Sequence, residues 1–439
     1  MNGQVAKTEF DISVVGLGRV GLPLALSFAD RGLNVLGIDN NQEILGSLRD
    51  GQMPFEEPGV QEVLERVRRA GKITLADRAA EAARAETIVL TLGTPSFSHI
   101  ESDLSQIRSA VDDLLALLRP GHALILRSTI APGTTEYVAG YIEKHRELRV
   151  GEDVFVAHAP ERIAAGKFLE EICSLPCIVA GVGEASTERA AEVFSILGAP
   201  IERTTPVQAE LAKIWTNILR YTMFALPNLL MMDCERYGAN VFEVIDTINR
   251  DYPRGGMKLP GLTGGTCLRK DFAFSEERSN APGMLLAVSR VNEAVPLFLV
   301  EGIKRRLGGL ANRKLGVLGL TFKRDTDDER DSLASKLIRL LERELADVVV
   351  CDPHAATPTQ PLSEAVEGAE AVIVTTNHSE FERPEVVQEI LRRASPGCLL
   401  VDPWNSFGTA QVFSYASEAA VMRSAETRLA GAAREDPPQ

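Results

Sequence analysis

The sequence predicts an α/β protein with two doubly wound domains joined by a central helical region. Short apolar strands alternate with helical segments at both ends of the chain, which is typical of sheets covered by helices. From Pro206 to Asn249 glycines are few and apolar residues recur with helical spacing, and a Gly/Pro-rich loop precedes a further helix from Pro282 to Leu307. The middle of the chain is therefore expected to be helical.

The first domain should begin with a strand over Asp11–Val15, a glycine-rich turn, a helix over Leu22–Arg31 and a strand over Leu33–Ile38. Later strands of an alternating parallel domain are expected at Thr87–Leu92, Ala123–Arg127, Val154–Ala157 and Ile178–Ala180. Strands of the second α/β domain are expected at Lys314–Gly319, Val348–Asp352, Ala371–Thr375 and Leu399–Asp402. The expected boundaries are 1–205, 206–308 and 309–428, with a disordered tail over 429–439.

Composition excludes several classes of function. The chain has 439 residues and a formal net charge of −14, which argues against an extended nucleic-acid surface. Its six cysteines form no CxxC pair and no apolar leader follows Met1, so a reduced, cytoplasmic protein is expected. The most apolar stretch, Met223 to Met232, falls far short of the ~20 residues that span a bilayer.

The turn Gly16-Leu17-Gly18-Arg19-Val20-Gly21 predicts a dinucleotide site. Gly16 permits the tight turn, Gly18 lets the backbone approach a pyrophosphate, and Gly21 lets the helix pack closely on the strand. Such a motif is weak alone, and its glycines could be ordinary turn residues. Here it follows a strand, opens a helix, and precedes Asp39 at the ~20-residue spacing expected for a ribose-binding carboxylate. An acid at this position favours NAD over NADP.

Cys267 lies in the run Gly261-Leu262-Thr263-Gly264-Gly265-Thr266-Cys267-Leu268-Arg269-Lys270-Asp271. A lone cysteine is by default a small buried apolar residue. The glycines, however, imply a backbone that approaches something closely, and Arg269 and Lys270 would favour a thiolate. A thiol beside a nicotinamide cofactor can capture an aldehyde, so that a second hydride leaves and a thioester is hydrolysed to an acid.

Glu210, Lys213 and Asn217 share one face of the long helix expected after Pro206. They could form a solvated stripe, but their neighbours Leu211, Ile214 and Leu219 are apolar. Lys213 and Asn217 are therefore candidates for stabilising an oxyanion on the substrate.

Taken together, these motifs resemble those of the UDP-glucose/GDP-mannose dehydrogenase family, from about residue 11 to about residue 405. The resemblance rests on Gly16–Ala25, Gly93-Thr94-Pro95, Arg127-Ser128-Thr129, Pro132-Gly133-Thr134, Pro160-Glu161-Arg162, Glu210–Lys213 with Asn217, the Cys267 run, Gly319–Lys323 and Asp327–Arg330. It implies a four-electron oxidation of the C6 hydroxymethyl of a nucleotide sugar to a carboxylate, with two NAD used in succession.

The resemblance also implies roles for individual residues. Cys267 resembles the nucleophile, Lys213 and Asn217 the oxyanion-binding pair, Asp271 and Thr129 the residues that position water, and Glu161 the acid/base of thioester hydrolysis. Cofactor contacts are expected from Gly16, Gly18, Arg19, Val20, Gly21, Asp39, Thr94, Thr129, Lys270 and Arg330. Substrate contacts are expected from Arg162, Ile163, Lys213, Asn217, Arg220, Arg250, Arg254, Gly261 and Lys323. The six histidines fall in none of these motifs, and no metal is expected.

Departures from the family pattern bear on the substrate. Arg19 stands where a Tyr is usual, and Thr266 where Ser or His is usual. Arg162 and Arg220 resemble the branch that acts on UDP-N-acetylhexosamines, such as UDP-N-acetylmannosamine, and Ala165 lacks the second Glu of the UDP-glucose branch. Lys270-Asp271 instead resembles the UDP-glucose and GDP-mannose branches. The balance favours an N-acetylhexosamine, with UDP-glucose or GDP-mannose as the alternative.

Two other classes of function stay open. One is a two-electron hydroxyacid dehydrogenase, in which Cys267 would be dispensable, and the other is a non-catalytic nucleotide-sugar-binding protein, against which Cys267, Lys213 and Asp271 together argue. The apolar central helix further predicts a homodimer.

Overall fold

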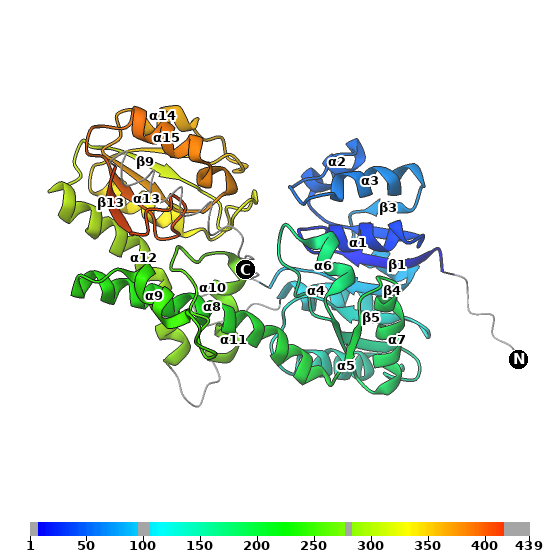
Figure 1. Ribbon diagram of the computed structural model, residues 1–439. Helices are drawn as coiled ribbons and strands as arrows, with labels where there is room; N and C mark the ends of the chain where they lie inside the picture. The colour runs from blue at the N-terminus through cyan, green and yellow to red at the C-terminus, as the bar shows by residue number, and fades with distance from the viewer. Residues whose placement is uncertain (1–7, 95–104, 277–282, 417–439) are drawn as a thin grey trace, which may run out of the picture. The chain divides into compact units, whose positions relative to one another are not determined.

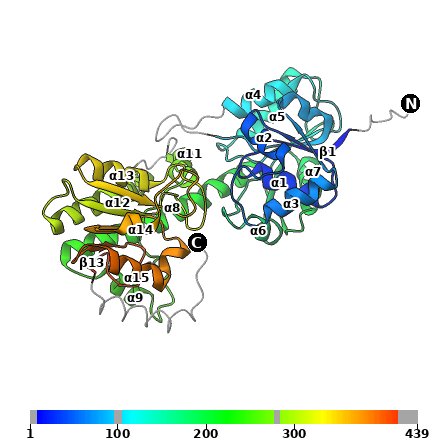
Figure 2. The same ribbon diagram turned by 90° about the horizontal axis from the view of Figure 1, so that it is seen from above.

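The computed structural model describes residues 8–94, 105–276 and 283–416 (Figure 1). The chain forms two compact units, Met1–Asn217 with Lys270–Ser279, and Ile218–Arg269 with Asn280–Gln439. Each unit contains one sheet with helices packed against it (Figures 1 and 2), so the predicted fold class is confirmed. The boundaries between the two units, after residues 217, 269 and 279, fall inside the predicted central domain. The domain boundaries at 205 and 308 stay predictions. The tail predicted for 429–439 lies outside the described residues.

The first unit is built on an eight-stranded sheet in the order β3-β2-β1-β4-β5-β6-β7-β8. Its strands are β1 Phe10–Val15, β2 Val35–Ile38, β3 Ile73–Ala76, β4 Ala85–Leu90, β5 Ala123–Leu126, β6 Phe155–His158, β7 Cys177–Gly181 and β8 Ile201–Arg203. The two strands that the sequence did not predict, β3 and β8, are the edge strands. They are short and partly exposed, and so lack a continuous apolar run.

One strand pair departs from the expected parallel arrangement. β7 runs antiparallel to β6, with Ala157 opposite Gly181, and the prediction of a wholly parallel first sheet was wrong at this pair. The link between them holds only α6, Phe168–Ser174, whose seven residues span about 10 Å. β7 starts from the edge of the sheet at which β6 ends, without a crossover to the other edge.

Helices cover both faces of this sheet because successive strand residues point to opposite faces. Ile12 and Val14 of β1 pack under α1, α3, α6 and α7, whereas Val15 packs under η1, α4 and α5. The helices of the first unit are α1 Gly21–Asp30, α2 Gln42–Asp50, α3 Val60–Arg69, η1 Ala79–Arg84, α4 Ser105–Leu115, α5 Thr134–His145, α6 and α7 Glu184–Ser195. Both faces are therefore buried, as the apolar strands require.

The central region is helical, as predicted. Its helices are α8 Pro206–Tyr237, α9 Val241–Asn249, α10 Thr266–Asp271, α11 Ala273–Glu276 and α12 Met284–Leu307. No helix within the described part of the chain combines the length and hydropathy that a membrane span needs.

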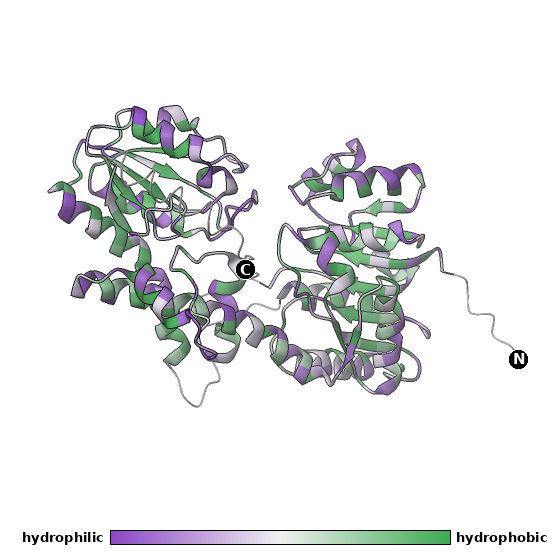
Figure 3. Ribbon diagram, viewed as in Figure 1, coloured by the Kyte–Doolittle hydropathy of each residue, from purple (hydrophilic) through white to green (hydrophobic). Residues whose placement is uncertain are grey.

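The second unit has a five-stranded sheet in the order β10-β9-β11-β12-β13, in which only β12 and β13 are antiparallel. Its strands are β9 Lys314–Leu318, β10 Asp347–Cys351, β11 Ala371–Val374, β12 Leu399–Val401 and β13 Phe413–Tyr415. Its remaining helices are α13 Leu333–Arg343, α14 Leu362–Val366, η2 Ser379–Glu382 and α15 Pro384–Arg393. In both units the strands are predominantly apolar, whereas most helices combine hydrophilic and hydrophobic residues (Figure 3).

The same turn follows the first strand of each unit, β1 and β9. Gly16 after β1 has φ 97°, and Gly319 after β9 has φ 104°. In the first unit Leu17 N–H donates to Asp39 Oδ2 at 2.6 Å, and in the second Leu320 N–H donates to Asp352 Oδ2 at 2.5 Å. Asp39 and Asp352 each follow the second strand of their unit, so the second domain repeats the turn of the first.

Two buried histidines are structural. His158 lies at the end of β6, its Nδ1 is 2.8 Å from the Leu126 carbonyl oxygen, and burial lowers its pKa to about 3. Burial, with the nearby Arg119, lowers the pKa of His122 to about 4. Both imidazoles are therefore neutral in the folded protein at neutral pH.

We expect acid to destabilise the fold through these histidines. The unfolded state takes up protons below its ordinary histidine pKa of 6.5, whereas folded His158 does so only near pH 3, so stability falls with pH between these values. The slope should approach about 1.4 kcal/mol per pH unit for each histidine. His158→Asn, which can still donate to the Leu126 carbonyl, should reduce the slope in urea unfolding. Exposed His145→Asn should not, and equal slopes for His158→Asn and wild type would contradict this account.

Candidate active site

The glycine turn of the first unit has the shape that a dinucleotide requires. A Cβ on Gly21 would lie 1.8 Å from the Gly16 carbonyl oxygen, so α1 starts too close to the turn for any side chain there. Gly18, in contrast, has open space where its Cβ would be. The turn lies at the carboxyl end of β1, where the strand order reverses: β2 and β3 lie on one side of β1, and β4 and the later strands on the other. The first turn of α1 holds no acidic residue. These residues fit a pyrophosphate bound at the α1 N-terminus.

The other expected cofactor residues of the first unit have defined partners. Asp39, at the end of β2, accepts hydrogen bonds from the Leu17 and Asn41 N–H groups. The Arg19 guanidinium lies 5.1 Å from the centre of the Phe55 ring, which holds it beside the turn, next to Val20. Lys270 Nζ lies 3.1 Å from Thr94 Oγ1. Thr129, half-buried, follows β5 at the same edge of the sheet.

Three expected catalytic residues of the first unit are buried around the α8–α10 contact. Asn217 on α8 donates from Nδ2 to Asp271 Oδ2 at 2.6 Å, and Asp271 is fully buried. Asp271 Oδ1 lies 3.1 Å from Lys270 Nζ. Lys213, one turn before Asn217 on α8, is 9% exposed and interacts electrostatically with His158. The predicted face of the helix therefore points inward, and the alternative of a solvated stripe is excluded for Lys213 and Asn217.

Glu210 fixes the start of α8, a role that the sequence did not reveal. Its carboxylate accepts the N–H groups of Gly133 at 2.6 Å and Thr135 at 2.9 Å, as well as the Thr135 hydroxyl. Burial raises the pKa of this carboxyl, and the donors act in the opposite direction. Because α5 has no side-chain cap of its own, Glu210 satisfies its first N–H groups and anchors the helix that carries Lys213.

Glu161 is held by an ion pair that crosses the sheet edge. Its carboxylate pairs with the buried Arg127 guanidinium and accepts the N–H groups of Arg162 at 2.6 Å and Ile163 at 2.7 Å. Arg127 also donates to the Ala159 carbonyl oxygen at 2.9 Å. With Arg162 and Ile163, both residues line a small hollow, so the Pro160-Glu161-Arg162 motif forms a braced turn.

The second unit holds Cys267, whose side chain is exposed, so the alternative of a buried cysteine is excluded. The glycines before it pack against their own unit. A Cβ on Gly261 would lie 2.4 Å from the Trp404 ring, one on Gly264 2.9 Å from the Asp331 carbonyl oxygen, and one on Gly265 2.7 Å from the Phe322 ring. The sequence predicted that the backbone at these glycines closely approaches another group. That group is the protein's own second unit rather than a ligand, and the contacts fix the path of the loop into α10.

Arg330 interacts electrostatically with the thiol of Cys267. A hydrogen bond to Asp328 and the charges of Asp328 and Cys267 raise the pKa of Arg330. Arg269, expected from sequence to favour the thiolate, instead pairs with Glu293 at 2.6 Å and Asp331 at 3.5 Å. Both arginines are therefore partly compensated by acids, and Arg330 is the one whose charge acts on Cys267.

A hollow in the second unit is lined by two expected substrate residues, Arg220 and Lys323. Its wall also includes Phe322, Arg324 and Trp404, so it combines cations with aromatic rings. Such a lining suits a nucleoside diphosphate. Arg250 and Arg254 are exposed and lie elsewhere in the unit, where Arg250 pairs with Asp246 and Arg254 Nε donates to the Tyr252 hydroxyl at 2.9 Å.

The predicted residues thus fall into two groups. The first unit contains the glycine turn, Asp39, Lys213, Asn217 and the Lys270-Asp271 pair. The second contains Cys267, Gly261, Arg220, Lys323 and Arg330. Sequence reasoning missed Arg127 as the partner of Glu161, because an ion pair between residues 34 apart leaves no pattern along the chain. It also missed that Arg330 pairs with Asp328, two residues before it.

Comparison with known proteins accounts for both groups. Three domain models of the UDP-glucose/GDP-mannose dehydrogenase family match this chain in order. The NAD binding domain matches residues 10–197, the central domain residues 207–294 and the UDP binding domain residues 316–409. The UDP-N-acetyl-D-mannosamine dehydrogenase of Pyrococcus horikoshii is 32% identical over 378 residues, which cover 84% of this chain and 90% of that protein.

Solved structures agree. The UDP-N-acetyl-mannosamine dehydrogenase of Staphylococcus aureus aligns with a TM-score of 0.79 at 32% identity, covering 88% of this chain and 93% of that one. A UDP-glucose dehydrogenase from Pyrobaculum islandicum aligns with a TM-score of 0.77 at 29% identity, covering 91% and 95%.

These matches confirm the family, NAD as the cofactor and an oxidoreductase activity. The glycine turn, the α8 face and the Cys267 loop are each matched by one of the three domain models. The chain belongs to the UDP-glucose/GDP-mannose dehydrogenase family.

Proposed function

We propose that the protein oxidises the C6 hydroxymethyl of a UDP-sugar, favouring a UDP-N-acetylhexosamine such as UDP-N-acetylmannosamine, to a carboxylate through a thiohemiacetal and a thioester on Cys267. One observation carries this proposal. An exposed thiol lies on the same six-residue helix as Asp271, whose buried carboxylate binds Asn217. An inert cysteine would not need such a setting.

The chemistry uses the residue types that are present. NAD, when bound at the glycine turn, accepts one hydride in each of two successive oxidations. After the first, the Cys267 thiolate adds to the aldehyde carbon, and Lys213 and Asn217 supply N–H donors to the oxyanion that forms. After the second, the carbon is a thioester. Water adds to it, the carbon–sulfur bond breaks, and the thiolate is released.

Hydrolysis of the thioester needs an oriented water and a proton carrier. We assign the orientation of the water to Asp271 and Thr129, because the two Asp271 oxygens, which face Asn217 and Lys270, each keep a second lone pair that can accept a hydrogen bond from water. We assign the acid/base role to Glu161. Its carboxylate must then give up one of its bonds to Arg127, Arg162 N–H or Ile163 N–H during the step.

Substrate binding is assigned to both units. In the second, Arg220 and Lys323 contribute charge to the hollow that we assign to the diphosphate. In the first unit, we assign substrate contacts to Arg162 and Ile163, whose backbone N–H groups donate to the Glu161 carboxylate. Arg250, Arg254 and Gly261 complete the proposed set, and Gly261 acts through the loop that its contact with Trp404 fixes. The similarity to dehydrogenases named for UDP-N-acetylmannosamine supports the preference for an N-acetylhexosamine. UDP-glucose remains the alternative, supported by a structural relative named for it.

A cytoplasmic location belongs to the same proposal, because a thiol nucleophile must stay reduced.

Hydride counting tests the reaction. We expect two NADH for each UDP-N-acetylmannosamine consumed, measured by absorbance against product quantified by chromatography, with slower turnover of UDP-glucose and GDP-mannose. Cys267→Ser should stop acid formation and leave NAD affinity unchanged, because the glycine turn lies in the other unit. The control is Cys173→Ser, an exposed cysteine on α6. One NADH per sugar, or wild-type turnover by Cys267→Ser, would refute the mechanism.

We further propose a homodimer formed through α8. Leu211, Trp215 and Leu219 lie at helical spacing on one stripe and are 39%, 49% and 60% exposed, and Leu226 is 52% exposed. Large apolar side chains exposed at helical spacing along one helix are typical of an interface. A second copy of the chain is the partner proposed because the same stripe on each copy can pair about a twofold axis.

Charge on this stripe should separate the subunits. We expect Trp215→Asp with Leu219→Asp to halve the mass measured by sedimentation velocity, because two buried carboxylates would replace apolar contacts. Tyr137→Asp, which changes an aromatic residue on α5 that is 59% exposed, should sediment as wild type does. A monomeric wild type, or an unchanged mass of the double variant, would rule out this interface.

A further inference from the structure

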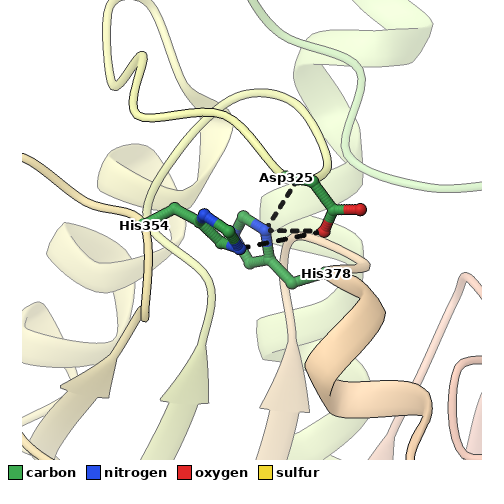
Figure 4. Close-up of side chains that lie close together, drawn as sticks. All are labelled: Asp325, His354 and His378. Carbon is green, nitrogen blue, oxygen red and sulfur yellow. Dashed lines mark hydrogen bonds and ion pairs between the residues drawn. The ribbon is translucent and has the colours of Figure 1, made fainter. Parts of the chain in front are cut away.

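A cluster of two histidines and one carboxylate joins three loops at one edge of the second sheet (Figure 4). Asp325 comes from the loop after β9, His354 from the loop after β10 and His378 from the loop after β11. Their candidate ligand atoms lie within 4.8 Å of one another. This edge is where ligands bind in doubly wound domains, because the chain leaves β9 toward β10 on one side and β11 lies on the other.

Hydrogen bonds show that the cluster is a clamp between loops rather than a metal site. His378 Nδ1 accepts the Asp325 N–H at 2.9 Å, which occupies the lone pair that a metal would need. The Asp325 carboxylate accepts the Ser379 N–H at 2.8 Å and the Ser379 hydroxyl. His354 Nε2 lies 3.2 Å from Glu380 Oε2, so each of the three side chains already has a polar partner in the second unit.

His378 makes a second contact from its other ring nitrogen. Because Nδ1 is an acceptor, Nε2 carries the proton, and it lies 3.1 Å from both Asp352 Oδ2 and Thr321 Oγ1. Burial alone would raise the pKa of Asp352, but His378 and the N–H groups of Leu320 and Thr321 hold it well below its ordinary range. The imidazole is fully buried, so it is fixed in this tautomer and orientation.

The same contacts distinguish the two acids that end the second strand of each sheet. Asp39 is half-buried beside the glycine turn of the first unit, where it can reach a ribose. Asp352 takes the equivalent position in the second unit, but it is buried under His378. The carboxylate of the second domain is thus used to hold a histidine.

Within this clamp, His378 forms hydrogen bonds with residues on both sides of Lys323. Thr321, two residues before Lys323, and Asp325, two residues after it, both contact His378. The Lys323 carbonyl oxygen accepts the hydroxyls of Thr321 at 3.2 Å and Thr326 at 2.9 Å. Asp325 has φ 53°, a left-handed conformation that a non-glycine residue keeps only when its surroundings hold it.

We propose that His378 is a positioning residue for the nucleotide-sugar site, acting through the 321–325 loop to place Lys323 in the wall of the hollow that it shares with Arg220. This inference rests on the proposed function, in which that hollow binds the diphosphate. His378 does not touch the substrate, and its effect is on binding rather than on the oxidation.

Two variants distinguish the contribution of Nδ1 of His378 from that of Nε2. His378→Gln can keep a donor near Nε2 for Asp352 but loses the acceptor for the Asp325 N–H, whereas His378→Asn keeps an acceptor near Nδ1. We expect His378→Gln to weaken UDP binding in calorimetry, and to raise KM for the UDP-sugar, by about tenfold, with kcat and NAD affinity unchanged. His378→Asn should recover most of the loss. Exposed His145→Asn is the control for histidine replacement.

A double-mutant cycle tests the route of the effect. If His378 acts through Lys323, His378→Gln should cost no further UDP affinity once Lys323→Met is present. Additive losses, or wild-type UDP affinity in His378→Gln, would overturn the proposal. Hydrogen exchange of residues 321–326 should be faster in His378→Gln, and this readout needs no activity. Failure of the proposed function would instead appear as a wild-type protein that binds no UDP and forms no NADH.

Discussion

The hydrogen bond between Asn217 and Asp271 is the contact on which the active-site arrangement depends. It is 2.6 Å long and buried, and it joins the 32-residue α8 to the six-residue α10. A charge-assisted bond without competing water is strong, and removing either partner would leave an unsatisfied polar group in the interior. Since Cys267 lies four residues before Asp271 on α10, the same bond restrains the helix that carries the thiol.

Other buried polar contacts serve that arrangement. Glu210 ties the start of α8 to the first N–H groups of α5, so Lys213 is carried on a helix that is anchored one turn earlier. Arg127 and Glu161 brace the turn after β6. Each of these acids is compensated by donors of the chain, which is the condition under which charge is tolerated in a protein interior.

Much of this could be predicted from the sequence because it is encoded locally. The glycine turn and Asp39 lie within one strand–helix–strand unit, and the inward face of α8 follows from helical spacing alone. The Cys267 loop was recognisable by its glycines, although what they approach is Trp404, Asp331 and Phe322.

The remaining features depend on segments far apart in the chain. The interaction of Arg330 with Cys267 arises where the loop after β9 meets α10, and no spacing along the chain predicts it. His378 reaches Thr321 across 57 residues, and the antiparallel pairing of β7 with β6 leaves no mark in the sequence of either strand. Tertiary contacts of this kind decide which of several local possibilities a residue takes.

The thioester on Cys267 is the central claim, and trapping it is the most direct test. Enzyme turning over UDP-N-acetylmannosamine with NAD would be quenched in acid, digested and mapped by mass spectrometry. We expect the Cys267 peptide to carry the mass of the oxidised nucleotide sugar in a hydroxylamine-labile bond, and the Cys173 peptide to be unmodified. Turnover during which the Cys267 thiol stays fully open to alkylation would contradict the account.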